Sequence, residues 1–496
     1  MFKLVTIWLV VVTCCLALHD KPTLRSRISR RGLDFFSSIG HNIVTKELPK
    51  IKYPNISLPI DGGPGSGQVN LTRLYIPKFE SPKFKFELAP PHGITWHSRD
   101  GAVKVYGEWS AKYTMLVTIY LSGYVTATVS DIRSTLTVGV HLDNEKPQLS
   151  IWNCTAQVEH FQMEIGGGVI PWIVNLFRGP LSEAVLNAIN TQFCDTTRTV
   201  LLQQANEALM SLPTRIPITD EINLDYRLLK NPISTSSYVE GETYIDVIFG
   251  NKTCDLPAGD LTYGNVSTDF MLNMWMSDSV ANCLLQSLHE TNLLHFVIDR
   301  GLYSKLDSFL KTSCPFYEIC LGRFFPELSK KYPNNYVDLY FHSSKPPATK
   351  FSSNITANAE FFIDFHISPY KKNPHVLARL SMFSNSTITP ALSKSRIVGT
   401  LNETDLRLSE EFSEIGNFSQ TFLNRMALIL KPLLKVTADT ALRVGIPIPM
   451  VENITLASRT SITVLERTLR IDADLLYANK TLTTRKLVKS QPRNFV

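Results

Sequence analysis

The chain has 496 residues, of which 44% are hydrophobic and 19% are charged. This length exceeds what one ordinary core accommodates, and the composition excludes a mostly disordered chain, so we expect at least two folded domains. The formal net charge of +6 is concentrated near the N-terminus, because residues 18–60 carry eight basic and three acidic side chains. A nucleic-acid-binding protein would spread such charge along one face, so we expect no nucleic-acid partner.

A secretory signal peptide is predicted at residues 1–17. Lys3 precedes an apolar run from Leu4 to Leu16, and Cys15-Leu16-Ala17 supplies a small-residue cleavage site. The alternative is a transmembrane anchor, but the run is too short to span a bilayer. We therefore expect a secreted, extracellular protein.

Glycosylation sequons support the same compartment. Eleven Asn-X-Ser/Thr sites are spread over both halves of the chain. They begin at Asn55, Asn70, Asn153, Asn251, Asn265, Asn354, Asn385, Asn402, Asn417, Asn453 and Asn479.

Six cysteines remain once the signal peptide is removed: Cys154, Cys194, Cys254, Cys283, Cys314 and Cys320. An even number in an oxidising compartment predicts disulfides, although six cysteines permit 15 pairings. Cys314 and Cys320 are close enough in sequence to close a small loop. No CxxC pair occurs, so we expect no structural zinc and no other metal site.

The predicted elements of the first half begin with a helix over residues 27–48, which Pro49 ends. A glycine-rich loop at 61–67 follows. From 72 to 151 apolar and polar residues alternate with a period of two, which predicts antiparallel strands with two distinct faces. Helical periodicity returns from Pro171 to Leu212.

A connector containing Pro213, Pro217 and Pro232 leads to a second half with the same order of elements. Helix is predicted over 274–311, and strands at 337–341, 361–367 and 469–475. A long helix is predicted over 418–442, with a kink at Pro432. One architecture is therefore expected twice.

A twisted antiparallel sheet covered by a long helix can enclose an elongated apolar cavity. An acyl chain would fill such a cavity favourably, because each buried CH₂ contributes about 0.8 kcal/mol. The alternative is that helix and sheet pack directly against each other.

Several segments carry a specific resemblance. They are Arg27–Phe36, Lys46–Pro54, Val103–Trp109, Pro171–Phe177, Leu186–Cys194, Pro326–Pro333, Ile415–Phe418 and Gly445–Pro449. In that order they resemble the family of bactericidal/permeability-increasing protein, lipopolysaccharide-binding protein, phospholipid transfer protein and cholesteryl ester transfer protein. The match runs from about residue 25 to 480.

The resemblance implies an α+β, two-domain boomerang. Each domain is a twisted antiparallel β-barrel or sheet wrapped on a long helix, and a central sheet joins the two. We expect an N-terminal lipid-binding barrel domain at 18–212, a linker or central sheet at 213–240, and a C-terminal lipid-binding barrel domain at 241–496. The resemblance also implies a Cys154–Cys194 disulfide, while the pairing of Cys254, Cys283, Cys314 and Cys320 stays open.

Each domain would hold a phospholipid-sized pocket lined by apolar helix residues. By helical face, the first pocket is predicted to use Leu33, Phe36, Ile43, Val174, Phe177 and Val185. The second is predicted to use Leu284, Leu288, Phe422, Met426 and Leu433.

The sequence departs from the antibacterial members of the family at one hairpin. There they cluster Lys and Arg, whereas Glu108–Thr114 has one Lys offset by one Glu, and Met115–Val129 lacks Lys, Arg and Glu. Phosphate binding needs several cations acting together, so this pattern disfavours endotoxin neutralisation. Arg25, Arg27, Arg30 and Arg31 are interpreted as a solvated helix end, the alternative being contact with anionic head groups. The basic tail Arg485, Lys486, Lys489 and Arg493 is interpreted in the same way.

Catalysis has no candidate residue. No Gly-X-Ser-X-Gly or HExxH motif occurs. His342 and His366 are expected to face solvent, and Asp472 and Asp474 are expected to be ordinary outward-facing charges.

The favoured hypothesis is a secreted, noncatalytic lipid-binding or lipid-transfer protein whose only bound group is a phospholipid or similar lipid. Its partners would be lipids and lipoprotein or membrane surfaces. The alternative is an innate-defence protein that binds lipopolysaccharide or other microbial surface lipids. A secreted lipase would need a nucleophilic serine, and no motif supplies one.

Overall fold

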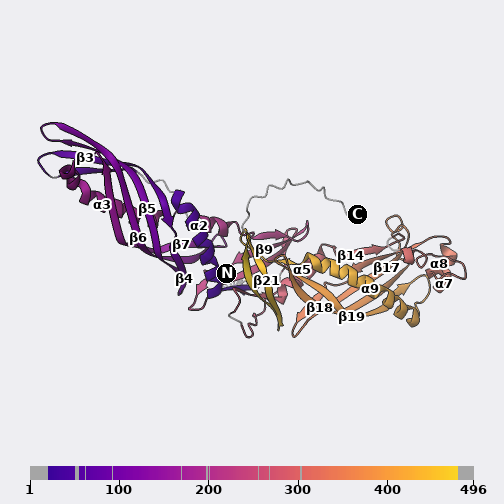
Figure 1. Cartoon of the computed structure of the whole chain (residues 1–496). Coiled ribbons are helices and arrows are strands. Elements are labelled where there is room, and N and C mark those ends of the chain that lie inside the picture. The colour runs from indigo at the N-terminus through magenta and orange to yellow at the C-terminus, as the bar shows by residue number, and fades with distance from the viewer. Residues whose placement is uncertain are drawn as a thin grey trace, which may run out of the picture.

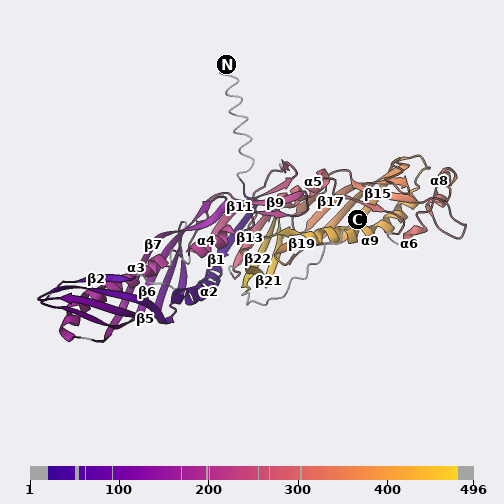
Figure 2. The same ribbon diagram turned by 90° about the horizontal axis from the view of Figure 1, so that it is seen from above.

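The computed structural model describes residues 21–478, except 51–54, 62, 92, 169, 197–198, 200–201, 255, 267–268 and 302–303. The predicted signal peptide, Asn479 and the basic tail lie outside the described residues. The described chain forms an elongated molecule with a sheet at each end and a third sheet between them (Figures 1 and 2). The expected α+β class, with curled antiparallel sheets, is confirmed.

The N-terminal sheet has the strand order β2-β3-β5-β6-β7, and β4 pairs with β5. Its strands are β2 (Ile56–Asp61), β3 (Ser66–Glu80), β4 (Lys83–Ala89), β5 (Gly93–Thr114), β6 (Thr118–Asp143) and β7 (Lys146–Gly167). All neighbours pair antiparallel. The predicted alternation is realised in β5, where Val103, Val105 and Trp109 are buried while Lys104 and Ser110 are exposed.

The C-terminal sheet has the order β14-β15-β17-β18-β19-β20, and β16 pairs with β17. Its strands are β14 (His295–Ile298), β15 (Val337–Ser343), β16 (Ala348–Phe351), β17 (Ile355–Ile367), β18 (Ala378–Ser393), β19 (Arg396–Ser413) and β20 (Ile446–Pro447). The predicted strands at 337–341 and 361–367 are therefore present, and each extends beyond its predicted bounds.

The central sheet has the order β21-β22-β13-β1-β11-β9-β8, and β10 and β12 both pair with β11. Its strands are β1 (Leu24–Ser29), β8 (Arg215–Pro217), β9 (Ile222–Leu228), β10 (Ile233–Ser234), β11 (Tyr238–Phe249), β12 (Lys252–Thr253), β13 (Leu272–Ser277), β21 (Ile454–Leu465) and β22 (Thr468–Tyr477). The first described strand of the chain thus lies in the middle of a sheet built mainly from residues 215–277 and 454–477.

Each half of the chain contains long helices that accompany its sheet and shorter helices that connect strands. In the first half these are α2 (Arg30–Glu47), with the 3₁₀ turn η2 (Leu48–Lys50), then α3 (Pro171–Thr196) and α4 (Gln203–Met210). The second half contains α5 (Asp278–Glu290), α6 (Ser304–Asp307), α7 (Leu321–Phe324), α8 (Pro326–Lys331) and α9 (Gln420–Val444). Helix α3 lies along the N-terminal sheet, and α9 along the C-terminal sheet (Figure 1).

Three helix predictions need correction. The helix predicted from residue 27 begins at Arg30, because Arg27–Ser29 belong to β1. The helix predicted over 274–311 is not continuous, because this range contains the end of the buried strand β13, then α5, the strand β14 and the short helix α6. Ser277 ends the strand and caps α5, its hydroxyl accepting a hydrogen bond from the backbone N–H of Ser279. The helix predicted to Leu212 divides into α3 and α4.

The two faces of the central sheet differ completely. One face is apolar, and Leu24, Met274 and Ile471 contribute to a core shared with α5. The other carries a cross-strand row in which Arg27 lies opposite Glu240 on β11 and Asn273 on β13, and Asn273 lies opposite Asp472 on β22. A one-residue slip of β1 would exchange the faces and bury its arginines in the core.

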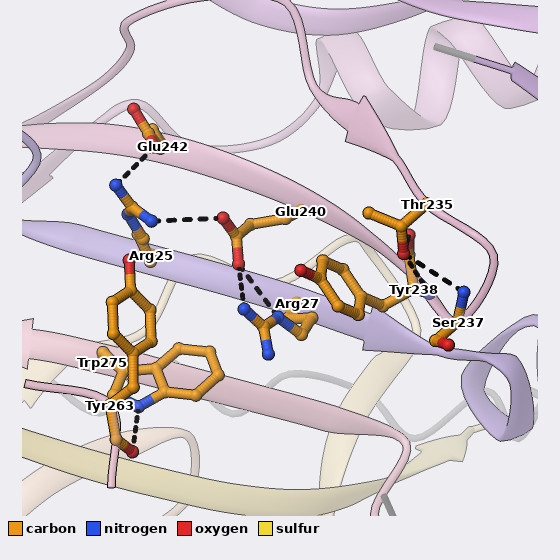
Figure 3. Close-up of polar contacts among 9 residues, drawn as sticks. All are labelled: Arg25, Arg27, Thr235, Ser237, Tyr238, Glu240, Glu242, Tyr263 and Trp275. Carbon is orange, nitrogen blue, oxygen red and sulfur yellow. Dashed lines mark hydrogen bonds and ion pairs between the residues drawn. The ribbon is translucent and has the colours of Figure 1, made fainter. Parts of the chain in front are cut away.

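Ion pairs hold this polar row together (Figure 3). The Nε and Nη2 atoms of Arg27 donate to Oε2 of Glu240 at 2.9 and 2.7 Å. Arg25 Nη2 lies 2.6 Å from Glu242 Oε1. The guanidinium carbon of Arg27 is also 3.8 Å from the Tyr238 ring centroid and 4.9 Å from that of Trp275. Interpreting Arg25 and Arg27 as a solvated helix end is therefore wrong.

The predictions for Asp472 and Asp474 are also wrong, because both carboxylates are buried and paired with cationic side chains. Asp472 is 1% exposed and accepts from Asn273 Nδ2 at 2.6 Å and from Arg470 Nε at 3.0 Å. Asp474 is also buried and pairs with Arg459 at 3.2 Å. Neither carboxylate is an ordinary outward-facing charge.

The C-terminal sheet has a comparable buried cluster. His366 is 6% exposed, and its ring Nδ1 hydrogen bonds to the carbonyl of His375. His342 Nε2 lies 3.2 Å from Asp364 Oδ2, so neither histidine simply faces solvent. Burial by itself would raise the pKa of Asp364, but the hydrogen bonds from Arg379 and His342 outweigh it and lower that pKa to about 2.

Three disulfides add covalent ties. Cys154 on β7 is bonded to Cys194 on α3, so the second long helix is attached to the N-terminal sheet. Cys314 is bonded to Cys320 and closes a short loop. Cys254 is bonded to Cys283, which ties the end of β12 to α5, so the pairing of the four cysteines that the sequence left open is Cys254–Cys283 and Cys314–Cys320.

We expect Arg27→Met to destabilise the central sheet by about 3 kcal/mol, because Oε2 of the buried Glu240 loses both of its hydrogen bonds and the carboxylate keeps only the longer contact of its Oε1 with Arg25, at 3.4 Å. Amide hydrogen exchange of β1 and β11 measures the local free energy of opening. Adding Glu240→Leu to Arg27→Met should recover much of the loss.

The matched control is Arg73→Met, which breaks an exposed pair with Glu108 on the N-terminal sheet. It should cost less than about 1 kcal/mol. Equal effects of the two arginine substitutions would contradict the role assigned to the central pair.

Asp364 should make the C-terminal sheet sensitive to acid. Its folded pKa lies below its unfolded value, so its contribution of about 2 kcal/mol is present above pH 4 and is lost as pH falls towards 2. In Asp364→Asn this part of the pH dependence should vanish in acid unfolding followed by hydrogen exchange of β17 and β18. Asp405→Asn, which alters an exposed pair with Arg407, should leave it intact.

Candidate functional site

The interior of the N-terminal half is formed by α3 and the inward face of its sheet. Val174, Phe177 and Val185 are at most 8% exposed. They share one apolar cluster with Val105 and Trp109 of β5, and the Trp109 and Phe177 ring centroids are 5.5 Å apart. Spacings of three and eight residues place these α3 side chains on one helical face, which is why a single helix can line the whole sheet.

The other residues predicted for the first pocket lie elsewhere. Leu33 of α2 is buried, with 4% of its surface exposed. Phe36 packs against the apolar core of the central sheet, and not against the α3 cluster. The side chain of Ile43 lies outside the described part of the chain. The structure thus brings together the three α3 residues and separates Phe36 from them.

The interior of the C-terminal half is formed by α9 and the inward face of its sheet. Phe422 and Met426 are buried there, and Leu433 is partly buried against the same cluster. Leu284 and Leu288 are not part of it. They lie on α5 and pack against the central core, as Phe36 does, so the predicted second set is divided between two cores.

Aromatic residues that the sequence analysis missed form much of the C-terminal interior. Phe325, Phe365 and Phe418 surround Phe422, and the Phe325–Phe418 and Phe418–Phe422 ring centroids are 4.4 and 5.6 Å apart. Phe365 could have been found from the alternation of the strand at 361–367. Phe418 begins the helix predicted over 418–442, four residues before Phe422, so its spacing could also have identified it. Phe325 lies just outside α7, where no periodic pattern marks it.

Helix α9 also presents apolar residues to solvent. Leu428 is 72% exposed and Val436 is 57% exposed, and their spacing of eight residues places them on one face. Ile429 is 45% exposed beside them. This face turns away from the buried residues Phe422 and Met426.

The β5–β6 hairpin at the far end of the N-terminal sheet is apolar at its tip. Leu116 is fully exposed, Val117 is 66% exposed and Tyr120 is 74% exposed. Further from the tip, Arg73 of β3 is paired with Glu108 of β5 at 3.0 Å. This arrangement matches the low cationic charge that the sequence analysis found in the hairpin.

A surface cavity of about 460 Å³ lies beside the Cys254–Cys283 disulfide. Its lining is mainly polar and comprises Phe249, Asn251, Lys252, Thr253, Leu256, Gln286 and Glu290. Asn251 is one of the predicted glycosylation sites and is exposed at this cavity. Such a lining suits water and not an acyl chain.

Ten of the eleven sequon asparagines lie in the described residues. Asn70 and Asn453 are half-buried, and the other eight are exposed, which leaves them accessible for modification. Within the described ranges no group of three or more His, Cys, Asp or Glu side chains is arranged to hold a metal ion. No described helix is both long and apolar enough to cross a membrane.

Comparison with known proteins matches this architecture along nearly the whole chain. The model of the LBP / BPI / CETP family N-terminal domain matches residues 32–204, and that of the C-terminal domain matches residues 217–477. The crystal structure of lipopolysaccharide binding protein superposes with a TM-score of 0.61 at 19% identity, covering 92% of this chain and all of that chain.

Relatives of similar length carry the same match. The bactericidal permeability-increasing protein of Sebastes schlegelii is 21% identical over 476 residues, covering 95% of this chain and 98% of that protein. The human lipopolysaccharide-binding protein is 22% identical over 449 residues, covering 89% and 91%. The chain therefore belongs to the LBP/BPI/CETP family.

Proposed function

We propose that the protein is a secreted, noncatalytic lipid-binding protein that holds phospholipid acyl chains against its helix-covered sheets. The observation that carries the proposal is the repeated pairing of a long helix with the apolar face of a curled sheet. In each half that pairing gathers a continuous interior of aliphatic and aromatic side chains. Such an interior suits hydrocarbon, because buried acyl carbons gain about 0.8 kcal/mol each.

The compartment is argued from covalent chemistry. Three disulfides tie the described chain, and disulfides persist in oxidising compartments. Eight exposed sequon asparagines suit an extracellular surface. Together with the predicted signal peptide, these features support secretion.

The second candidate is recognition of lipopolysaccharide. It is favoured by the names of the relatives, since one is a lipopolysaccharide-binding protein and another is a bactericidal permeability-increasing protein. The N-terminal hairpin disfavours this candidate, because its tip exposes Leu116 and Val117 where an anionic glycolipid would need clustered cations. We therefore propose acyl-chain binding as the primary property and lipopolysaccharide as the alternative ligand.

Native mass spectrometry of the glycosylated protein from a eukaryotic secretory host tests the proposal. Delipidated protein incubated with phosphatidylcholine vesicles should take up about two phospholipids, one for each helix-covered sheet. A protein that keeps its fold and takes up none would contradict the proposal. Salt-dependent binding of lipopolysaccharide, without uptake of phosphatidylcholine, would favour the alternative.

Two substitutions should separate the halves. Val185→Phe enlarges a side chain in the α3 interior, and Met426→Trp enlarges one in the α9 interior. Each should lower the uptake from two lipids to one, because the added volume occupies space that the acyl chain would fill. Circular dichroism and thermal melting check that each variant is folded, since overpacking itself costs about 1–3 kcal/mol. Unchanged uptake in both folded variants would place the lipids elsewhere.

A further inference from the structure

A short disulfide-closed loop at the end of the C-terminal half exposes large apolar side chains. This tip loop, Cys314–Cys320, precedes α7 at the end of the molecule opposite the N-terminal sheet (Figure 1). Phe316 is 84% exposed, Tyr317 is 73% exposed and Ile319 is 67% exposed. Large apolar side chains that are exposed next to one another often mark an interaction site.

The loop is held in shape from below. The Cys314–Cys320 bond closes it, and the backbone N–H of Glu318 donates to the carbonyl of Pro315 at 3.0 Å. Arg323 adds a second brace, because its Nη1 donates to the carbonyls of Phe316 and Glu318. The apolar side chains are therefore displayed by an ordered turn.

The residues at the base of the loop are buried. Cys320 and Leu321 have no exposed surface, and Leu310 and Phe325 are at most 3% exposed. The two leucines and Phe325 are part of the C-terminal core, whereas Phe316 lies outside it. The Phe316 and Tyr317 rings contact each other edge to face, with centroids 5.6 Å apart, and project from the loop together.

The charges around the loop suit a phospholipid surface. Glu318 is the one acidic residue of the loop, and Lys311 neutralises it at 2.9 Å. Arg323 places a guanidinium at the base of the loop, below the apolar side chains, where lipid phosphates would lie if those side chains entered the acyl layer. Tyr317 combines an apolar ring with a polar hydroxyl, a combination typical of the membrane–water boundary.

We propose that the tip loop docks the protein on phospholipid surfaces by inserting Phe316, Tyr317 and Ile319 into the boundary between head groups and acyl chains. A convex loop at the end of an elongated molecule can reach a flat surface without interference from the rest of the fold (Figure 2). The proposal extends the proposed function by naming how the protein meets the surface that supplies lipid. It does not require cargo in the interior, so either proposal can fail while the other stands.

Co-sedimentation of the full glycosylated protein with phosphatidylcholine vesicles tests the docking. Phe316→Ser combined with Tyr317→Ser should lower the partition coefficient at least tenfold, because burial of each large apolar side chain is lost. The wild-type coefficient should change little between low and high ionic strength, since the interaction is apolar. Both substituted side chains are exposed, so the thermal melting curve should be unchanged.

The matched control is Leu428→Ser combined with Val436→Ser on α9, which removes two exposed apolar side chains remote in sequence from the loop. It should leave vesicle binding unchanged. An equal loss in both double variants, or no loss in the loop variant, would overturn the proposal. Binding that disappears at high ionic strength would also overturn it in favour of an electrostatic surface.

Two further variants test insertion and bracing directly. The fluorescence of the tryptophan introduced by Tyr317→Trp should be quenched by phospholipids brominated on their acyl chains. If this fluorescence is not quenched in vesicle-bound protein, the proposal is overturned. Cys314→Ser combined with Cys320→Ser keeps every apolar side chain but removes the clamp. It should weaken binding severalfold, because the turn must then be ordered on the surface.

Discussion

The contact between Arg27 and Glu240 is the constraint on which the arrangement of the two halves depends. A carboxylate that is 8% exposed needs a cationic partner, and Arg27 donates two hydrogen bonds to its Oε2 while Arg25 contacts its Oε1 at 3.4 Å. Because the two residues lie directly opposite each other, the pair also fixes the register of β1 against β11. From that register follow the apolar face of the central sheet and the point at which α2 leaves for the N-terminal half.

The sheets at the two ends each have an apolar face that must be kept from water, and apolar helix side chains cover it in both. Both α3 and α9 turn an apolar stripe towards a curled sheet, and the cores that result are made almost entirely of aliphatic and aromatic groups. The buried charged residues lie instead on the polar face of the central sheet and around Asp364 in the C-terminal sheet. This separation leaves the interiors free of buried charge, which is what an apolar ligand requires.

The strands of the first half could be predicted because their signal is local. Buried residues alternate regularly over Gly101–Thr114 of β5, although the register shifts just before this stretch, and β5, β6 and β7 follow one another in sequence. The stretch from Arg25 to Ser29 has no such signal, since two arginines two residues apart suit a strand or a helix end equally. Its partner Glu240 is 213 residues away in the sequence, so only the fold reveals that the charges are paired. Leu284 and Leu288 fail for a related reason: helical periodicity identified an apolar face but not the core that it meets.

The position of β1 has a consequence for the order of folding. The six strands of the N-terminal sheet are contiguous in the chain, so this sheet can assemble as soon as residues 56–167 have been synthesised. Strand β1 precedes them all, yet its neighbours β11 and β13 are translated much later, and β22 lies close to the end of the described chain. During synthesis the first strand must therefore remain with two unpaired edges, and closing so long a loop makes completion of the central sheet a late and slow step of folding.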